Sequence, residues 1–150
     1  IGKTNGHLGQ SAIMKELFDR EEGDAPSVDL NAEKIAGDFV RASHRSNIIT
    51  AAHDVSDGGL AIAATEMSIS AGFGVSLLGG DTGWFFGEDQ GRYILACKDS
   101  DALIKAADLA GIPAQLIGSF GGDKIKLGEA SIDFIDVKNA HETILKSLVS

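Results

Sequence analysis

A polar, glycine-containing segment follows a short apolar run near the middle of the chain. The apolar run is 48–52 (IITAA), and residues 53–60 read HDVSDGGL. In open α/β sheets, ligands bind beyond the carboxyl ends of strands. Asp54 and Asp57 supply carboxylate oxygens, which suit Mg²⁺, and a helix that begins after the glycines offers N–H groups to an anion. The segment indicates a metal-bridged phosphate site; spacing alone leaves open an ordinary helix cap with a glycine turn.

A second candidate segment, 84–93, reads WFFGEDQGRY. Glu88 and Asp89 could hold Mg²⁺, Gln90 and Gly91 could contact a bound ligand, and the arginine after them could pair with a phosphate through two hydrogen bonds. Composition alone leaves a simpler alternative open. In that alternative the segment is a polar loop with an aromatic anchor and an exposed pair of acids.

The third candidate is the stretch GHLGQS at 6–11. Gly9 and Ser11 precede a predicted helix, so they either cap that helix or bind a phosphate there. The chain has no Walker A loop, no G-x-G-x-x-G after a strand and no cluster of Cys and His with metal-ligand spacing. The residues alone therefore identify no catalytic base.

Composition limits the class of protein. The 150 residues suffice for about one domain, and 43% of them are apolar, which is enough for a core. A net charge of −9 disfavours nucleic acid and membrane surfaces as partners, and no apolar run approaches the ~18 residues of a spanning helix. The single cysteine and the lack of a secretory leader favour the cytoplasm. We expect residues 1–150 to form a single domain, and the first residue, Ile rather than Met, suggests a piece of a longer polypeptide.

Periodicity and breaker residues predict alternating helices and strands. The helices are predicted at 10–18, 31–46, 60–70, 99–110 and 139–149. The strands are predicted at 48–52, 75–78, 92–98, 116–120, 124–127 and 131–135, with a glycine-rich loop at 79–91. Asn31 is expected to cap the second helix, and Gly121 and Gly122 to make a hairpin between the fourth and fifth strands. The fold class is α/β (α+β): a mixed sheet with helices packed against it.

The same segments carry a resemblance to a known family. HDVSDGGLA at 53–61 followed by Glu66 and Met67, the opening 4–11, the acidic loop and helix across 21–40, and FGEDQGRY at 86–93 resemble the C-terminal domain of the aminoimidazole-ribonucleotide-synthetase superfamily. Within that superfamily they are most similar to the large subunits of phosphoribosylformylglycinamidine synthases of the small bacterial type. The resemblance covers nearly the whole chain, and its motifs are specific in combination.

This resemblance implies an ATP-dependent C–N ligase of purine biosynthesis. Formylglycinamide ribonucleotide, ATP and glutamine-derived ammonia would give the amidine, ADP and phosphate. The family's catalytic histidine lies in an upstream domain, so this chain would supply one wall of the cleft and be inactive alone. The implied cofactors are Mg²⁺ and ATP, and the implied partners are the upstream domains, a glutaminase subunit and a small accessory subunit.

The resemblance also assigns residues. It implies nucleotide contacts from Asp54, Ser56, Gly87 and Glu88, metal contacts from Asp54, Glu88 and Asp89, and substrate contacts from Gln90 and Gly91. The family often has Ser or Pro at 89–91, where this chain has Asp-Gln-Gly. Two alternatives stay open. One is another member of the superfamily, of the thiamine-phosphate kinase or selenophosphate synthetase type; the other is a non-catalytic interaction domain.

Overall fold

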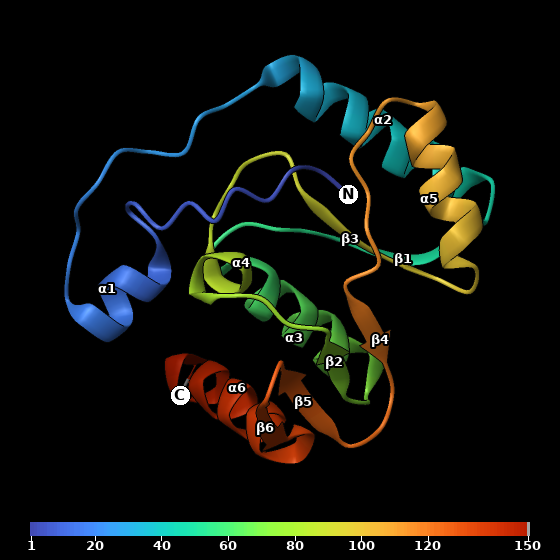
Figure 1. Cartoon of the computed structure of the whole chain (residues 1–150). Helices are drawn as coiled ribbons and strands as arrows, with labels where there is room; N and C mark the ends of the chain where they lie inside the picture. The colour runs from blue at the N-terminus through green and yellow to red at the C-terminus, as the bar shows by residue number, and fades with distance from the viewer. Residues whose placement is uncertain (150) are drawn as a thin grey trace. The chain divides into compact units, whose positions relative to one another are not determined.

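The computed structural model describes residues 1–149, with side chains up to residue 143, and divides into two compact units. The first unit contains Ile1–Ala63 and Gly80–Leu116, and the second contains Ala64–Gly79 and the chain from Ile117 onward. Both units contain helices and strands (Figure 1). The predicted α/β class with a mixed sheet is confirmed. The expectation of a single domain stays a prediction.

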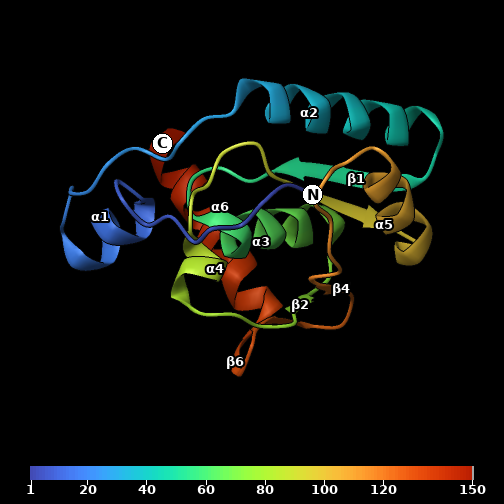
Figure 2. The ribbon, with the colours of Figure 1, turned by 45° about the horizontal axis from the view of Figure 1, so that its top comes forward.

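The first unit is built on a two-stranded antiparallel sheet. Strand β1 (Ile49–Asp54) pairs with β3 (Tyr93–Cys97), so that Asp54 lies opposite Tyr93. Helix α2 (Leu30–Arg45) packs against β1, as Figure 2 shows above the two strands. The other helices of this unit are α1 (Ala12–Phe18), α4 (Thr82–Phe86), α5 (Ser100–Leu109) and the first turn of α3 (Gly59–Ala71).

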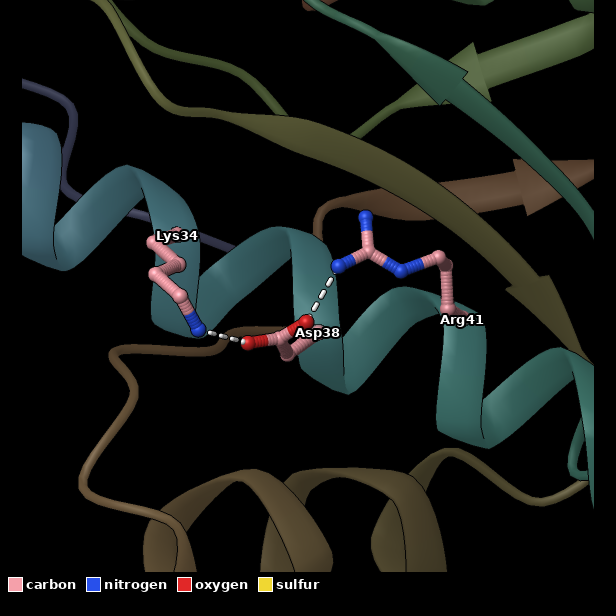
Figure 3. Close-up of polar contacts among 3 residues, drawn as sticks. All are labelled: Lys34, Asp38 and Arg41. Atoms are coloured by element: carbon pink, nitrogen blue, oxygen red, sulfur yellow. Dashed lines mark hydrogen bonds and ion pairs between the residues drawn. The ribbon is translucent and has the colours of Figure 1, made fainter.

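Helix α2 begins one residue earlier than predicted, and its cap is Asp29 rather than Asn31. The Asp29 carboxylate accepts hydrogen bonds from the N–H groups of Asn31 and Ala32, which have no partner within the helix. On its exposed side, Asp38 pairs with Lys34 and Arg41, one turn before and one turn after it (Figure 3). This spacing brings side chains together on a helix surface.

The second unit holds a four-stranded sheet in the order β4-β2-β5-β6. Its strands are β2 (Val75–Leu77), β4 (Gly118–Phe120), β5 (Lys124–Leu127) and β6 (Ala130–Asp133), and α6 (Phe134–Val149) follows. β2 runs antiparallel to β4 and parallel to β5. The predicted hairpin between β4 and β5 is therefore wrong, because β2 lies between them; β5 forms its hairpin with β6 instead.

Helix α4 lies inside the segment predicted as a glycine-rich loop. The carboxylate of Asp81 accepts the Trp84 N–H at 2.8 Å and so caps this short helix. The Trp84 and Phe85 rings pack edge to face, with centroids 4.9 Å apart. Phe85 is buried, so the helix anchors the start of the acidic loop that follows it.

Each unit has its own buried apolar residues. In the first unit these come from both strands, four helices and the loops, and include Ala36, Ile49, Leu60, Phe85, Ile94, Leu103 and Ile112. In the second they include Met67, Val75, Leu77 and Ile125. The predicted apolar stripe of α1 is not buried in this way, because Leu17 and Phe18 lie exposed. Among the described helices, none is long and apolar enough to cross a bilayer.

Candidate functional site

The two candidate segments lie side by side in the first unit. Strand β1 extends two residues beyond its predicted end, so His53 and Asp54 belong to the strand and not to the loop after it. Asp54 pairs with Tyr93, and the N–H of Val55 donates to the carbonyl of Arg92 at 3.0 Å. The antiparallel pairing thus brings the carboxyl end of β1 to the residues immediately before β3.

Asp54 is an exposed acid at this strand end. Its side chain is 70% exposed, and its Oδ1 lies 3.8 Å from Nδ1 of His53, a ring that carries charge only when protonated. Ser56 and Asp57 are exposed as well. A carboxylate and a hydroxyl in solvent at the end of a strand are available to a ligand from outside this unit.

The glycines after the strand allow close contact with the protein's own backbone. Gly59 has φ +65°, and a Cβ there would lie 2.7 Å from the Gly87 carbonyl oxygen and 2.8 Å from that of Phe85. A Cβ on Gly58, at φ +77°, would lie 2.2 Å from the side chain of Ile62. Both positions therefore require glycine for a structural reason, whatever ligand the site takes.

Glu88 joins three segments that are far apart in sequence. Its Oε1 accepts the N–H of Gly58 at 2.8 Å and the N–H of Ala12 at 2.7 Å. Its own N–H donates to the carbonyl of His7 at 2.8 Å. The carboxylate thus lies where helices α1 and α3 begin, at the position where the sequence suggested an anion.

Asp89 is buried and is fixed by backbone donors. Only 5% of the residue is exposed, and its Oδ2 accepts the N–H groups of Asn5 at 3.0 Å and Gly6 at 2.9 Å. Burial is the largest single influence and raises the pKa. The Gly6 and Asn5 donors and the charge of Arg92 together outweigh it, so the pKa of Asp89 lies below its ordinary value.

Arg92 completes this group from inside the unit. It is 2% exposed, and its guanidinium donates to the carbonyls of Asp89 and Gly87 and to the hydroxyl of Thr4. Burial lowers its pKa, while the charges of Asp89 and Glu88 raise it. The phosphate pairing considered for this arginine finds no support in the geometry, because its donors are directed at protein oxygens.

The remaining predicted residues differ in accessibility. Gly87 is buried, and a Cβ there would lie 2.3 Å from the Gly83 carbonyl oxygen. Gln90 is exposed, and Gly91, at φ +68°, is half-buried against Glu33. Of the loop residues predicted to contact a ligand, Gln90 has the most exposed position.

The donor types suit Mg²⁺, but their placement does not form one site in this chain. Among the residues that the structure describes, no three His, Cys, Asp or Glu side chains gather in a way that could hold a metal ion. Asp89 is buried on two N–H groups, Oε1 of Glu88 accepts two others, and Asp54 is in solvent. Asp54, Glu88 and Asp89 thus form no shared metal site among the described residues, and we assign no step to a metal here.

Sequence reasoning missed the role of the N-terminal segment 4–12. The structure places its backbone against the loop 87–92, through donors from Asn5, Gly6 and Ala12. Ser11, expected as a cap, makes no capping hydrogen bond and donates its hydroxyl to the carbonyl of Leu8. Nothing local in the sequence shows that an acid 76 residues away replaces that cap.

Known proteins are similar in sequence to this chain over most of its length. The profile of the family "AIR synthase related protein, C-terminal domain" matches residues 2–128. The PurL subunit of phosphoribosylformylglycinamidine synthase from Cereibacter sphaeroides is 50% identical over 143 residues, which are 94% of this chain and 20% of that subunit. The same subunit from Roseobacter denitrificans is 48% identical with the same coverage. The chain thus spans about a fifth of the length of these curated relatives.

Solved structures share the fold. Thermotoga maritima PurL complexed with FGAR superposes with a TM-score of 0.69 at 13% identity, over 89% of this chain and 26% of that one. The complex of that PurL with ATP gives a TM-score of 0.65 at 13% identity, over 88% of this chain and 24% of that one. At this identity the likeness concerns the backbone arrangement alone.

Proposed function

The chain belongs to the family of AIR synthase related C-terminal domains, and from this premise we propose that it serves as the C-terminal part of a phosphoribosylformylglycinamidine synthase. One observation carries the proposal: 50% identity to the PurL subunit of that enzyme over 94% of the chain. No comparable observation favours the superfamily alternatives or the interaction-domain alternative.

The reaction of such an enzyme is an ATP-driven amide-to-amidine conversion. The γ-phosphoryl group of ATP is transferred to the amide oxygen of formylglycinamide ribonucleotide, which releases ADP. Ammonia then attacks the activated carbon, and phosphate leaves with that oxygen. Positioning of two anionic substrates and stabilisation of the developing charge supply most of the rate enhancement in such transfers.

We propose that the end of β1 faces the active-site cleft that this chain would form together with the upstream domains. Asp54 and Ser56 are exposed there and are free to orient a nucleotide or its counter-ion. Gln90 is the exposed residue of the acidic loop, and we propose it for substrate contact together with Gly91. The nucleotide role of Gly87 and the metal roles of Asp54 and Asp89 stay predictions. The nucleotide and metal roles of Glu88 stay predictions too, although its hydrogen bonds to Ala12 and Gly58 favour a positioning role.

The proposed assembly extends beyond the chain. The fold of this chain matches part of a structure of PurLQS from Thermotoga maritima, with a TM-score of 0.65 at 11% identity. We propose corresponding partners here: upstream domains that supply the catalytic histidine, a glutaminase subunit that supplies ammonia, and a small accessory subunit. A cytoplasmic location goes with this role, ATP is the proposed nucleotide, and Mg²⁺ is the ion that its phosphates would bring.

The test is turnover by the complete polypeptide that carries this chain. ADP formation should require formylglycinamide ribonucleotide and ammonia together, and the amidine should appear in equal amount. If ATP is consumed without that substrate dependence, the proposed function is wrong.

Asp54→Asn tests the site within that assay. We expect kcat/KM to fall about 10-fold or more, because a charged contact to a bound ligand is lost, while the melting temperature stays unchanged. Asp108→Asn, on the exposed side of α5, is the matched control and should leave both quantities unchanged. Activity and melting temperature that fall together in Asp54→Asn would mean that Asp54 is structural.

A further inference from the structure

The carboxylate of Glu88 occupies a position that a helix-bound anion would otherwise take. Helix α1 and helix α3 each begin with N–H groups that have no partner within the helix. Neither helix has an acid in its first turn. One oxygen of Glu88 accepts from the first residue of α1, Ala12, and from Gly58, directly before α3.

This arrangement leaves Glu88 little freedom to act elsewhere. The residue is half-buried, its N–H donates to the carbonyl of His7, and Arg92 contributes a favourable charge close by. Negative charge at a helix N-terminus is stabilising, and two such termini share this one. A phosphate at the start of α3 would have to displace a carboxylate that already accepts two backbone N–H groups.

We propose that Glu88 is a positioning residue: its carboxylate caps α1, whose own cap residue makes no side-chain hydrogen bond, and holds the Asp57–Gly58 turn before α3 against the acidic loop. Asp54 and Ser56 precede that turn in the chain: Asp54 is the last residue of β1, and Ser56 follows it by two positions. Glu88 therefore fixes the placement of the exposed strand end without contacting the ligand. The functional part of this inference rests on the proposed synthase activity, but the structural part does not.

Three variants of the complete polypeptide test this role. Glu88→Ala removes the acceptor, and Glu88→Gln keeps an oxygen acceptor while it removes the charge. Glu16→Gln, on the exposed side of α1, is the matched control. Amide hydrogen exchange, measured by mass spectrometry on the peptides that contain Ala12 and Gly58, reports directly on the two hydrogen bonds.

In Glu88→Ala, exchange in both peptides should accelerate about 10-fold or more. Glu88→Gln should recover most of that protection, and Glu16→Gln should not change it. In the synthase assay, Glu88→Gln should also recover most of the kcat/KM that Glu88→Ala loses, with an unchanged Mg²⁺ concentration for half-maximal rate. This pattern supports a positioning role.

The opposite pattern would overturn the proposal. If Glu88→Gln is as impaired as Glu88→Ala and needs more Mg²⁺, while the Ala12 and Gly58 peptides keep wild-type protection, Glu88 is a ligand of the metal or nucleotide. Should Glu88→Ala fail to fold, Glu88→Gln and its exchange pattern still decide between the two roles. The exchange experiment needs no turnover, so its outcome is separate from that of the proposed function.

Discussion

Asp89 and Asp38 are aspartates whose pKa values both lie below the ordinary value, for different physical reasons. Asp89 is buried and is bound mainly by the backbone N–H groups of Gly6 and Asn5. Asp38 lies on the surface of α2, where hydrogen bonds from Lys34 and then Arg41 lower its pKa (Figure 3). The donors of Asp89 are already ordered by the fold, whereas those of Asp38 are long side chains that lose freedom when they bind.

The difference shows that the contribution of a carboxylate's interactions to stability depends on whether they are buried or exposed to solvent. An exposed ion pair is screened by water and salt, and its contribution to stability is small. A buried carboxylate that loses its partners, or buried donors that lose their carboxylate, leave unsatisfied groups in a medium of low polarity. The acidic loop and the α2 surface should therefore respond very differently to the same substitution.

The largest effect is expected for Asp89→Ala. The variant leaves the N–H groups of Asn5 and Gly6 without their acceptor, and it removes the larger of the two acidic charges that act on the buried guanidinium of Arg92. We expect the free energy of unfolding to fall by about 3–5 kcal/mol, measured by urea denaturation. Asp38→Ala is the surface comparison and should change it far less. Equal losses in the two variants would refute the contrast drawn between these regions.

Gly59→Ala is expected to have the next largest effect, and it tests how tightly the acidic loop is packed. The new Cβ would lie 2.7 Å from the Gly87 carbonyl oxygen, and we expect a loss of about 2–4 kcal/mol from strain and overpacking together. Gly111 has a similar φ of +69°, but a Cβ added there would meet nothing within 4 Å. Gly111→Ala should therefore cost only about 1–2 kcal/mol. If thermal unfolding shows the same loss in both, the loop is loosely packed.

The smallest effect is expected in the free energy of unfolding measured as a function of pH, in the acidic range. Both aspartates have lowered pKa values in the folded state, so the unfolded chain binds protons first as the pH falls below about 4. Their contribution to stability is present above that pH and is lost as the pH falls through the folded-state pKa. Asp89→Asn should flatten the curve below pH ~4. Asp38→Asn should flatten it only slightly, and less in high salt.

Local patterns in the sequence predicted most elements. The prediction for β5, 124–127, matches the structure, and the helical period found α2 and α5 to within one or two residues. Helix α4 was missed because its five residues include a glycine and three aromatics, although Asp81 ahead of them is a recognisable cap. The strand order was not predictable in this way. The pairing of β2 with β4 and β5 joins residues more than 40 positions apart.

In the candidate site, too, local patterns predicted some features, whereas contacts between distant segments could not be predicted. The position of Asp54 at the end of a strand follows from the pattern of apolar residues before it, and the structure places it there. The partners of Glu88 and Asp89 could not be predicted, because an acid in a glycine-rich loop looks the same whether it faces solvent or a backbone N–H. The N-terminal segment that provides those donors is 76 to 84 residues away.

The position of β2 inside its sheet has a consequence for how the chain is made. β2 has β4 on one edge and β5 on the other, and both are synthesised some 40 residues after it. Until those residues leave the ribosome, Val75–Leu77 has no partner strand on either edge. An apolar strand in that state can pair with a neighbouring chain. A polypeptide that stops before Gly118 would keep both edges open permanently, so we expect such a truncation to aggregate during synthesis.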